Sequence, residues 1–222
     1  MTLEEKRALA MARMRQTLEC FGLGTTVGWT GGKDSTVVLA LWRVVLAEHA
    51  PEARVRALNL DTGCKFPEVL AFRDRLARDW NIDLHIIRPS VPLSRYPLAR
   101  DPLTCCRDLK VVPLNNALQN LGISALLTGV RADENPNRAG HPWLEEHVDP
   151  VHVRAAPILE WTELDVWTFL VREGIPWCPL YDEGYRSLGC MPCTSRSGHG
   201  ERSGRDSRKE EHMGQLRSLG YF

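Results

Sequence analysis

The sequence predicts an α/β protein in which a parallel β-sheet carries helices on both faces. Short apolar segments alternate with helical segments along most of the chain, which is typical of a parallel sheet. Three of the apolar segments end in stretches that are rich in glycine and charged residues: TGGKDS, DTG and GVRADE. Because such sheets bind their ligands beyond the carboxyl ends of the strands, we expect one crevice to gather all three stretches.

The elements follow one another in a regular order from the N-terminus. Residues 1–24 are amphipathic, with three glutamates and no apolar central block, and therefore predict a first helix and not a targeting peptide. The segments that follow predict four strands, which lie at residues 25–29, within 54–63, at 83–90 and within 123–134. Helices are expected between the first three strands, over residues 35–50 and 67–80.

The composition is that of an ordinary globular protein with one large domain. The 222 residues are 43% hydrophobic and 25% charged, so a packed core is expected. The formal net charge is zero, which argues against a general attraction to nucleic acid or membrane and makes any anion site local. No apolar run approaches the roughly 20 residues of a membrane helix, and we expect a cytoplasmic protein.

The composition changes beyond about residue 151. The stretch PILEWTELDVWTFLVREGIP predicts a loop and then a helix, with Thr162 as its N-cap and Asp165 three residues later. The end of the chain is rich in Gly, Ser and Arg, and predicts a flexible basic arm that forms a lid, contacts nucleic acid or remains solvated. The predicted division is a first helix over 1–24, a nucleotide-binding domain over 25–195 and a C-terminal arm over 196–222.

The TGGKDS stretch has the features of a phosphate-binding loop between a strand and a helix. Its two glycines let backbone N–H groups approach an anion, and the helix that follows turns its unpaired N–H groups toward the same point. The lysine adds a positive charge and the hydroxyls add donors, whereas the aspartate is better suited to hold the loop, cap the helix or bind Mg²⁺. The residues of this loop are Thr30, Gly31, Gly32, Lys33, Asp34 and Ser35.

Four of the seven cysteines form two close pairs. Cys105 and Cys106 are adjacent, and Cys190 and Cys193 form a C-x-x-C pattern. An odd number of cysteines without an export signal argues against a disulfide framework. Four thiolates suit a structural zinc ion or an iron–sulfur cluster, although adjacent cysteines are an awkward chelate for tetrahedral zinc. A redox pair at the C-x-x-C pattern is a further interpretation.

Both patterns resemble those of a known family. TGGKDS is similar to the S-G-G-K-D-S loop of the N-type ATP pyrophosphatase superfamily, and CC…C-x-x-C resembles the [4Fe–4S] motif of adenylyl-sulfate reductases in the PAPS reductase family. The resemblance extends over about residues 25–195 and implies an adenine nucleotide α-hydrolase-like (Rossmann-like) three-layer sandwich. It also implies ATP, adenylyl sulfate or PAPS as the ligand. The implied ligands of one [4Fe–4S] cluster are Cys105, Cys106, Cys190 and Cys193.

The resemblance also implies roles for residues at the strand ends. Arg131 and Arg138 would grip the phosphate or sulfate end of the substrate, as suits a permanently charged fork. Asp61 lies in a stretch similar to the DTG-x-K-F-x-E block of the ATP sulfurylase small subunit and would lie near the phosphates or Mg²⁺. Two readings remain for Cys64, a small loop residue or a sulfur-carrying thiol. The implied catalytic residues are Lys33, Asp34, Asp61 and Arg131.

The C-terminal arm departs from the reductase pattern. Reductases of this family end in a Glu-Cys-Gly-Leu-type motif, whose cysteine attacks the sulfur of the sulfonucleotide. Here the arm reads KEEHMGQLRSLGYF, and alignment on Gly214 places Met213 at that position. A thioether cannot form and resolve a thiosulfonate intermediate, and no cysteine follows Cys193.

Three hypotheses for the function follow. The first is an ATP-pyrophosphatase-type enzyme that activates an acceptor, such as a nucleic acid, by adenylylation during sulfur transfer. The second is an adenylyl-sulfate or PAPS reductase that takes its reducing thiol from a partner protein. The third is a non-enzymatic subunit that senses nucleotide or redox state. A protein partner that supplies sulfur or a thiol is expected, and a homo-oligomer is compatible with the sequence.

Overall fold

The computed structural model describes residues 1–138 and 140–221 and contains a six-stranded sheet. The strand order is β3-β2-β1-β4-β6-β5, and all neighbours are parallel except β5 and β6. Because β2 and β4 flank β1, the direction of strand addition reverses at β1, which is where such folds bind ligands. The strands are β1 (Thr25–Gly28), β2 (Arg56–Leu60), β3 (Asp83–Ile87), β4 (Ala125–Leu127), β5 (Leu144–Val148) and β6 (Val151–Ala155).

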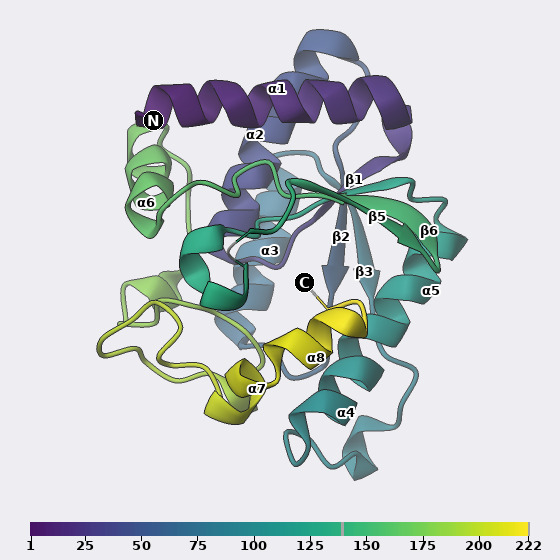
Figure 1. Cartoon of the computed structure of the whole chain (residues 1–222), viewed down its shortest axis with the longest axis vertical. Helices are drawn as coiled ribbons and strands as arrows, with labels where there is room; N and C mark the ends of the chain where they lie inside the picture. Colours follow the sequence, from purple (N-terminus) through teal and green to yellow (C-terminus); the bar gives the residue numbers. More distant parts are fainter. Residues whose placement is uncertain (139, 222) are drawn as a thin grey trace.

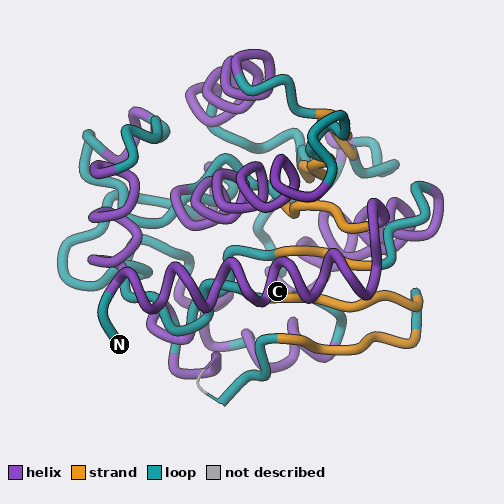
Figure 2. Tube along the Cα trace, turned by 90° about the horizontal axis from the view of Figure 1, so that it is seen from above, coloured by secondary structure: helices purple, strands orange, loops and turns teal. Residues whose placement is uncertain are grey.

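Helices cover both faces of the sheet and make three layers (Figures 1 and 2). One face carries α2 and α3, and α1 and α6 pack against α2. The other face carries α5, whose buried leucines pack against β2 and β4. The α-helices are α1 (Leu3–Phe21), α2 (Lys33–His49), α3 (Pro67–Asp79), α4 (Pro102–Cys106), α5 (Val112–Asn120), α6 (Glu163–Arg172), α7 (Ser207–Glu211) and α8 (Met213–Ser218).

Helix α2 forms the centre of the larger core because it is apolar on several sides. Val37, Val38 and Trp42 are at most 1% exposed, since α2 lies between the sheet and two other helices. Burial of side chains of this size stabilises a fold by about 1.5–3 kcal/mol each. This core fixes the N-terminus of α2, and therefore the glycine loop, against the end of β1.

The predicted fold class is confirmed, and the four predicted strands correspond to β1–β4. Thr162 caps α6, and its hydroxyl accepts the Asp165 N–H while the Asp165 carboxylate accepts the Thr162 N–H. The β5–β6 hairpin was not predicted. Its second strand reads VHVRA, an alternation of apolar and polar residues over only five positions, and its polar pair His152 and Arg154 is buried with a hydrogen bond of 3.1 Å between them.

The arm packs on the domain over its described residues 196–221, which differs from the expected flexible segment. Helices α7 and α8 contact α4 in this structure (Figure 1). Met213 and Leu216, one helical turn apart, are at most 5% exposed and pack with Cys106, so this apolar pair places the arm. In residues 1–138 and 140–221, none of the helices has both the length and the apolar character that a membrane crossing requires.

Candidate active site

The TGGKDS loop connects β1 to α2 as the sequence predicted. Gly31 has φ +82°, and a Cβ there would lie 2.9 Å from Val69, so glycine fits both the backbone and the space. The Thr30 hydroxyl accepts the Gly32 N–H at 3.2 Å and bonds the Ser35 hydroxyl at 3.0 Å. These polar groups therefore hold the loop in shape at the N-terminus of α2.

Lys33 does not point into open solvent but is 1% exposed. Its Nζ donates to Asp34 at 3.3 Å, to the carbonyl of Arg186 at 3.0 Å and to the carboxylate of Glu201 in the C-terminal arm. Burial alone would lower the pKa of Lys33, but the nearby carboxylates outweigh it and raise the pKa above its ordinary value. Lys33 is therefore a permanent cation at the loop.

Arg131 supplies the second buried cation of the site. Its side chain is 0% exposed, its Nε donates to Asp34 at 2.6 Å, and its Nη2 donates to both oxygens of Glu201 at 2.6 Å. Asp34 therefore orients Arg131 and Lys33, and these two cations hold its pKa below the ordinary value despite burial. The structure brings the two segments together because β4 lies beside β1.

Gly129 allows this close approach between the end of β4 and α2. A Cβ at position 129 would lie 2.6 Å from the backbone nitrogen of Ser35 and 2.7 Å from the carbonyl carbon of Asp34. Backbone atoms cannot yield as a flexible side chain can, so any larger residue would separate Arg131 from the loop.

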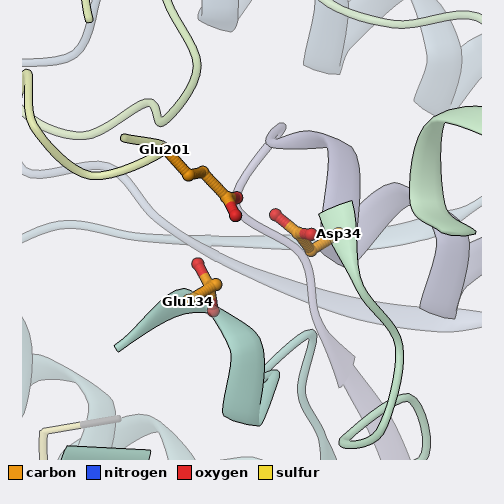
Figure 3. A group of neighbouring side chains, drawn as sticks. All are labelled: Asp34, Glu134 and Glu201. Carbon is orange, nitrogen blue, oxygen red and sulfur yellow. The ribbon is translucent and has the colours of Figure 1, made fainter. Parts of the chain in front are cut away.

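Three carboxylates meet at the centre of the site. Figure 3 shows Asp34, Glu134 and Glu201 converging, and one oxygen of each lies within 4.8 Å of the others. The cations that pair with these carboxylates are Lys33, Arg131, Arg138 and Arg202. A Mg²⁺ ion favours anionic oxygens that other cations do not already neutralise. The carboxylates therefore do not fit a magnesium site as they stand.

Two adjoining cavities form a crevice beside the loop. A polar cavity of about 120 Å³ touches Thr30, Asp34 and Arg138. A more apolar cavity of about 90 Å³ lies between Trp29, Leu58 and Leu114. Five residues line both cavities: Gly28, Thr30, Leu188, Arg205 and Tyr221. This crevice has one end for an apolar ring and one end for an anion.

The four predicted ligand cysteines line one small cavity together. Cys105 and Cys106 end α4, and the turn after them, η3 (Arg107–Val111), is a π-helical turn. Such a turn is a recurrent feature of functional sites. Cys190 and Cys193 line the cavity from a later segment of the chain. Lys65, which follows the DTG stretch, forms an isolated antiparallel β-bridge with Cys190. A fifth thiol, Cys64, lines the same cavity.

The spacing of the thiols argues against a zinc ion. Four thiolates on one zinc would lie about 3.8 Å apart, given a Zn–S distance of about 2.3 Å and tetrahedral geometry. In the described part of the chain, no three thiols bring their sulfur atoms within 4.8 Å of one another. As arranged here, the thiols do not form a tetrahedral zinc site.

Lysines lie between the thiols and the crevice. Lys110 lines both the thiol cavity and the apolar cavity, so its charge lies near the sulfurs. Burial would raise the pKa of Cys190, but Lys110 and Lys65 lower it to about 7. Burial would also raise the pKa of Tyr221, but Lys110 and Lys209 lower it to about 7. The positive charge of these lysines therefore favours the anionic form of both groups.

Arg205 has few hydrogen-bond partners for a guanidinium in a buried position. Its side chain is 9% exposed, its Nε has no hydrogen-bond partner, and its Nη1 lies 3.5 Å from the Thr194 hydroxyl. It lines both cavities of the crevice. An anion in the crevice would satisfy it.

Several residues of the site were not identified from the sequence. Glu134 lies in the GVRADE stretch but was not identified as a site residue, and Glu201 lies in no motif. No pattern in the sequence indicated Tyr181, whose hydroxyl accepts the Lys33 N–H at 2.9 Å. Tyr221 is the second-to-last residue of the sequence. The basic character of the arm was the single sign that Arg205 and its neighbours belong here.

Asp61 has contacts of its own within the DTG loop. One oxygen accepts the Gly63 N–H at 3.1 Å, and the other lies 3.4 Å from Arg88 and 3.8 Å from Arg73. These contacts hold the loop that carries Cys64 and Lys65. A catalytic role for Asp61 stays a prediction.

Comparisons with known proteins identify the relatives of this chain. Residues 25–196 match the family model of the phosphoadenosine phosphosulfate reductase domain. The chain is 38% identical over 191 residues to the adenosine 5'-phosphosulfate reductase of Mycolicibacterium smegmatis, covering 80% of each protein. It is 32% identical to the phosphoadenosine 5'-phosphosulfate reductase of Gloeobacter violaceus, covering 87% of this chain and 82% of that protein.

Solved structures share the fold at lower identity. The phosphoadenylyl-sulfate (PAPS) reductase from Candida auris in a phosphate complex has a TM-score of 0.68 and 21% identity, covering 84% of this chain and 90% of that chain. Candida glabrata FMN adenylyltransferase with FAD and pyrophosphate has a TM-score of 0.72 and 18% identity, covering 89% of this chain and 68% of that chain.

Proposed function

The chain belongs to the phosphoadenosine phosphosulfate reductase family, whose members act in sulfur metabolism, and we propose that it is a sulfonucleotide reductase that takes its reducing thiols from a partner. This was the second hypothesis from the sequence, and the names of the relatives favour it over adenylylation of an acceptor. The substrate is adenylyl sulfate or its 3'-phosphorylated form.

The observation that carries the proposal is that the crevice and the thiol cavity are neighbours that share Lys110 in their linings. The apolar cavity has the character of a nucleoside site, and the polar cavity, with Arg138 and Arg205, suits the phosphate and sulfate groups. Lys110 borders the apolar cavity and the thiol cavity. The sulfuryl group would therefore lie in a positive region that stabilises the negative charge developing on AMP as it leaves.

The thiols for the reaction come from outside the chain in this proposal. Met213 stands in the arm at the position where the aligned reductase motif has its cysteine. Its side chain packs with Cys106, and the residue is 5% exposed. A partner thiolate attacks the sulfur, so that an S–S bond forms, the S–O bond to AMP breaks and AMP leaves. A second thiol then attacks the partner's sulfur and releases sulfite. The sulfate sulfur gains two electrons, and the two thiols form a disulfide.

The proposal includes a [4Fe–4S] cluster held by Cys105, Cys106, Cys190 and Cys193. The gathering of these four thiols around one cavity supports it, as do Lys110 and Lys65 near Cys190. When bound, the cluster would add a charged, polarisable group beside the substrate. The chain's own contribution is the set of buried lysines that offset the negative charge of the thiolates.

Two assays test the proposal. Protein purified without oxygen should release sulfite and AMP from adenylyl sulfate when a dithiol is supplied, and should release no pyrophosphate from ATP and Mg²⁺. Pyrophosphate release without sulfite would instead support adenylylation of an acceptor. Tight nucleotide binding without either product would support a sensing subunit.

Absorbance tests the cluster separately. We expect a broad band near ~400 nm that is lost in Cys190→Ser and retained in Cys20→Ser, because Cys20 is exposed on α1 and far in sequence from the other thiols. The absence of iron and sulfide in the anaerobically purified protein would contradict this part of the proposal.

A further inference from the structure

A carboxylate of the arm forms ion pairs with the two cations that would bind the anionic groups of a nucleotide. Glu201 is 8% exposed on its side chain and contacts the Nζ of Lys33 and the Nη2 of Arg131. The loop carries two glycines and lies at the N-terminus of a long helix, which favours an anion, although the Gly32 and Lys33 N–H groups donate to the Thr30 and Tyr181 hydroxyls in this structure. Glu201 therefore stands where an anionic group of a ligand would be held.

Neither cation has a donor to spare while Glu201 is in place. The three N–H donors of Lys33 are directed to Asp34, the carbonyl of Arg186 and Glu201. Arg131 directs Nε to Asp34, Nη1 to Asp133 and the carbonyl of Trp161, and Nη2 to Glu201. Of these partners, Glu201 alone belongs to the arm and can leave without disturbing the sheet.

The segment that carries Glu201 is a loop closed at its base. The Ser195 N–H donates to the carbonyl of Gly204 at 2.7 Å, and Thr194 pairs with Arg205 in an antiparallel bridge. The Arg186 guanidinium donates to the carbonyl of His199 at 3.3 Å, and the Ser197 N–H donates to the carbonyl of Gly184 at 3.1 Å. Arg202 of the same loop pairs with Glu134 and Glu210. We call residues 196–203 the strap. Its base keeps Arg205 in the crevice even when the tip moves.

We propose that Glu201 is an internal competitor for the nucleotide, which holds Lys33 and Arg131 until an anionic group of the ligand replaces it. This rests on the proposed function only in taking an adenine nucleotide as the ligand. The exchange favours ligands with two negative charges. A dianion attracts Lys33 and Arg131 more strongly than does the singly charged carboxylate that it replaces. Glu201 is therefore a residue that sets specificity for multiply charged nucleotides.

The charge around Glu201 supports the exchange. Asp34 and Glu134 lie within 4.8 Å of it, so three carboxylates repel one another in a buried space. Burial raises the pKa of Glu201 and Asp34 raises it further, although Lys33 and Arg131 act against this. The ion pairs hold the Glu201 carboxylate in place, but its burial and the repulsion from Asp34 and Glu134 are unfavourable. Binding of an anionic ligand in place of Glu201 would relieve that repulsion.

Binding of AMP and of adenosine to the purified protein tests the proposal. In Glu201→Gln, AMP should bind about tenfold more tightly than in the wild type, because the competing charge is gone. Adenosine, which carries no phosphate, should bind with unchanged affinity. Glu211→Gln is the matched control, since Glu211 is an exposed glutamate of the same arm, and it should leave both affinities unchanged.

A second variant keeps the test decisive if the arm moves in Glu201→Gln. Glu201→Asp keeps the charge but shortens its reach to the two cations, so AMP affinity should rise by less than in Glu201→Gln. Unchanged or weaker AMP binding in Glu201→Gln would overturn the proposal. Because AMP binding needs no turnover, a failure to release sulfite would overturn the proposed function and leave this inference standing.

Discussion

Replacement of Arg131 by methionine tests the ionic centre of the site. The guanidinium is fully buried, and it bonds Asp34 and Glu201 at 2.6 Å. Removal of one partner of a buried pair costs about 3–5 kcal/mol, because the other charges remain buried without compensation. In a protein of this size, each kcal/mol lowers Tm by about 2–4 °C. Arg131→Met should therefore lower Tm by about 6–20 °C in a circular dichroism melt.

A double-mutant cycle with Glu201→Gln then tests the contact itself. In the wild-type background this substitution should cost less than Arg131→Met, since Asp34 continues to pair with both cations. In the Arg131→Met background it removes a carboxylate that has lost a main partner. The double variant should therefore be more stable than the sum of the single effects by about 0.5–3 kcal/mol in urea unfolding. Additivity within about 0.5 kcal/mol would refute the described contact.

Three further predictions concern the loop and its cover. Gly129→Ala should destabilise the protein by about 1–3 kcal/mol and weaken AMP binding at least tenfold, because its Cβ would meet the Ser35 backbone; unchanged binding would contradict this geometry. Tyr181→Phe should cost about 0.5–1.5 kcal/mol in urea unfolding, since the Lys33 N–H loses its acceptor; no loss would mean that water replaces the hydroxyl. Burial raises the pKa of Glu201, so the carboxylate becomes neutral at a higher pH than usual; sulfate should bind more tightly as the pH falls from about 8 to about 5, and this trend should be weaker in Glu201→Gln, where only other groups such as Tyr221 still titrate.

The sequence predicted the sheet and the glycine loop because both depend on local patterns. Apolar segments with glycine at their ends identified β1–β4, and Thr162 with Asp165 identified the start of α6. The structure also brought the four cysteines to one cavity, as the resemblance implied. These features need no knowledge of contacts between distant parts of the chain.

The contacts that complete the site could not be predicted in this way. Lys33 and Glu201 are 168 residues apart in sequence, and no periodic pattern relates them. The arm has the composition of a solvated tail, and its docking depends on the apolar pair Met213 and Leu216 within a polar segment. The β5–β6 hairpin escaped prediction for a similar reason, since Arg154 is buried there by a hydrogen bond and not by an apolar face.

The strap also has a consequence for the order of events during synthesis. Lys33 and Arg131 emerge from the ribosome well before Glu201. Until residue 201 has been synthesised, neither cation can pair with the Glu201 carboxylate. In that interval a phosphate or nucleotide from the surroundings can act as their counterion. Refolding of the purified chain should accordingly be faster in phosphate than in chloride at equal ionic strength. In Glu201→Gln, both the refolding rate and the stability of the folded protein should depend on phosphate.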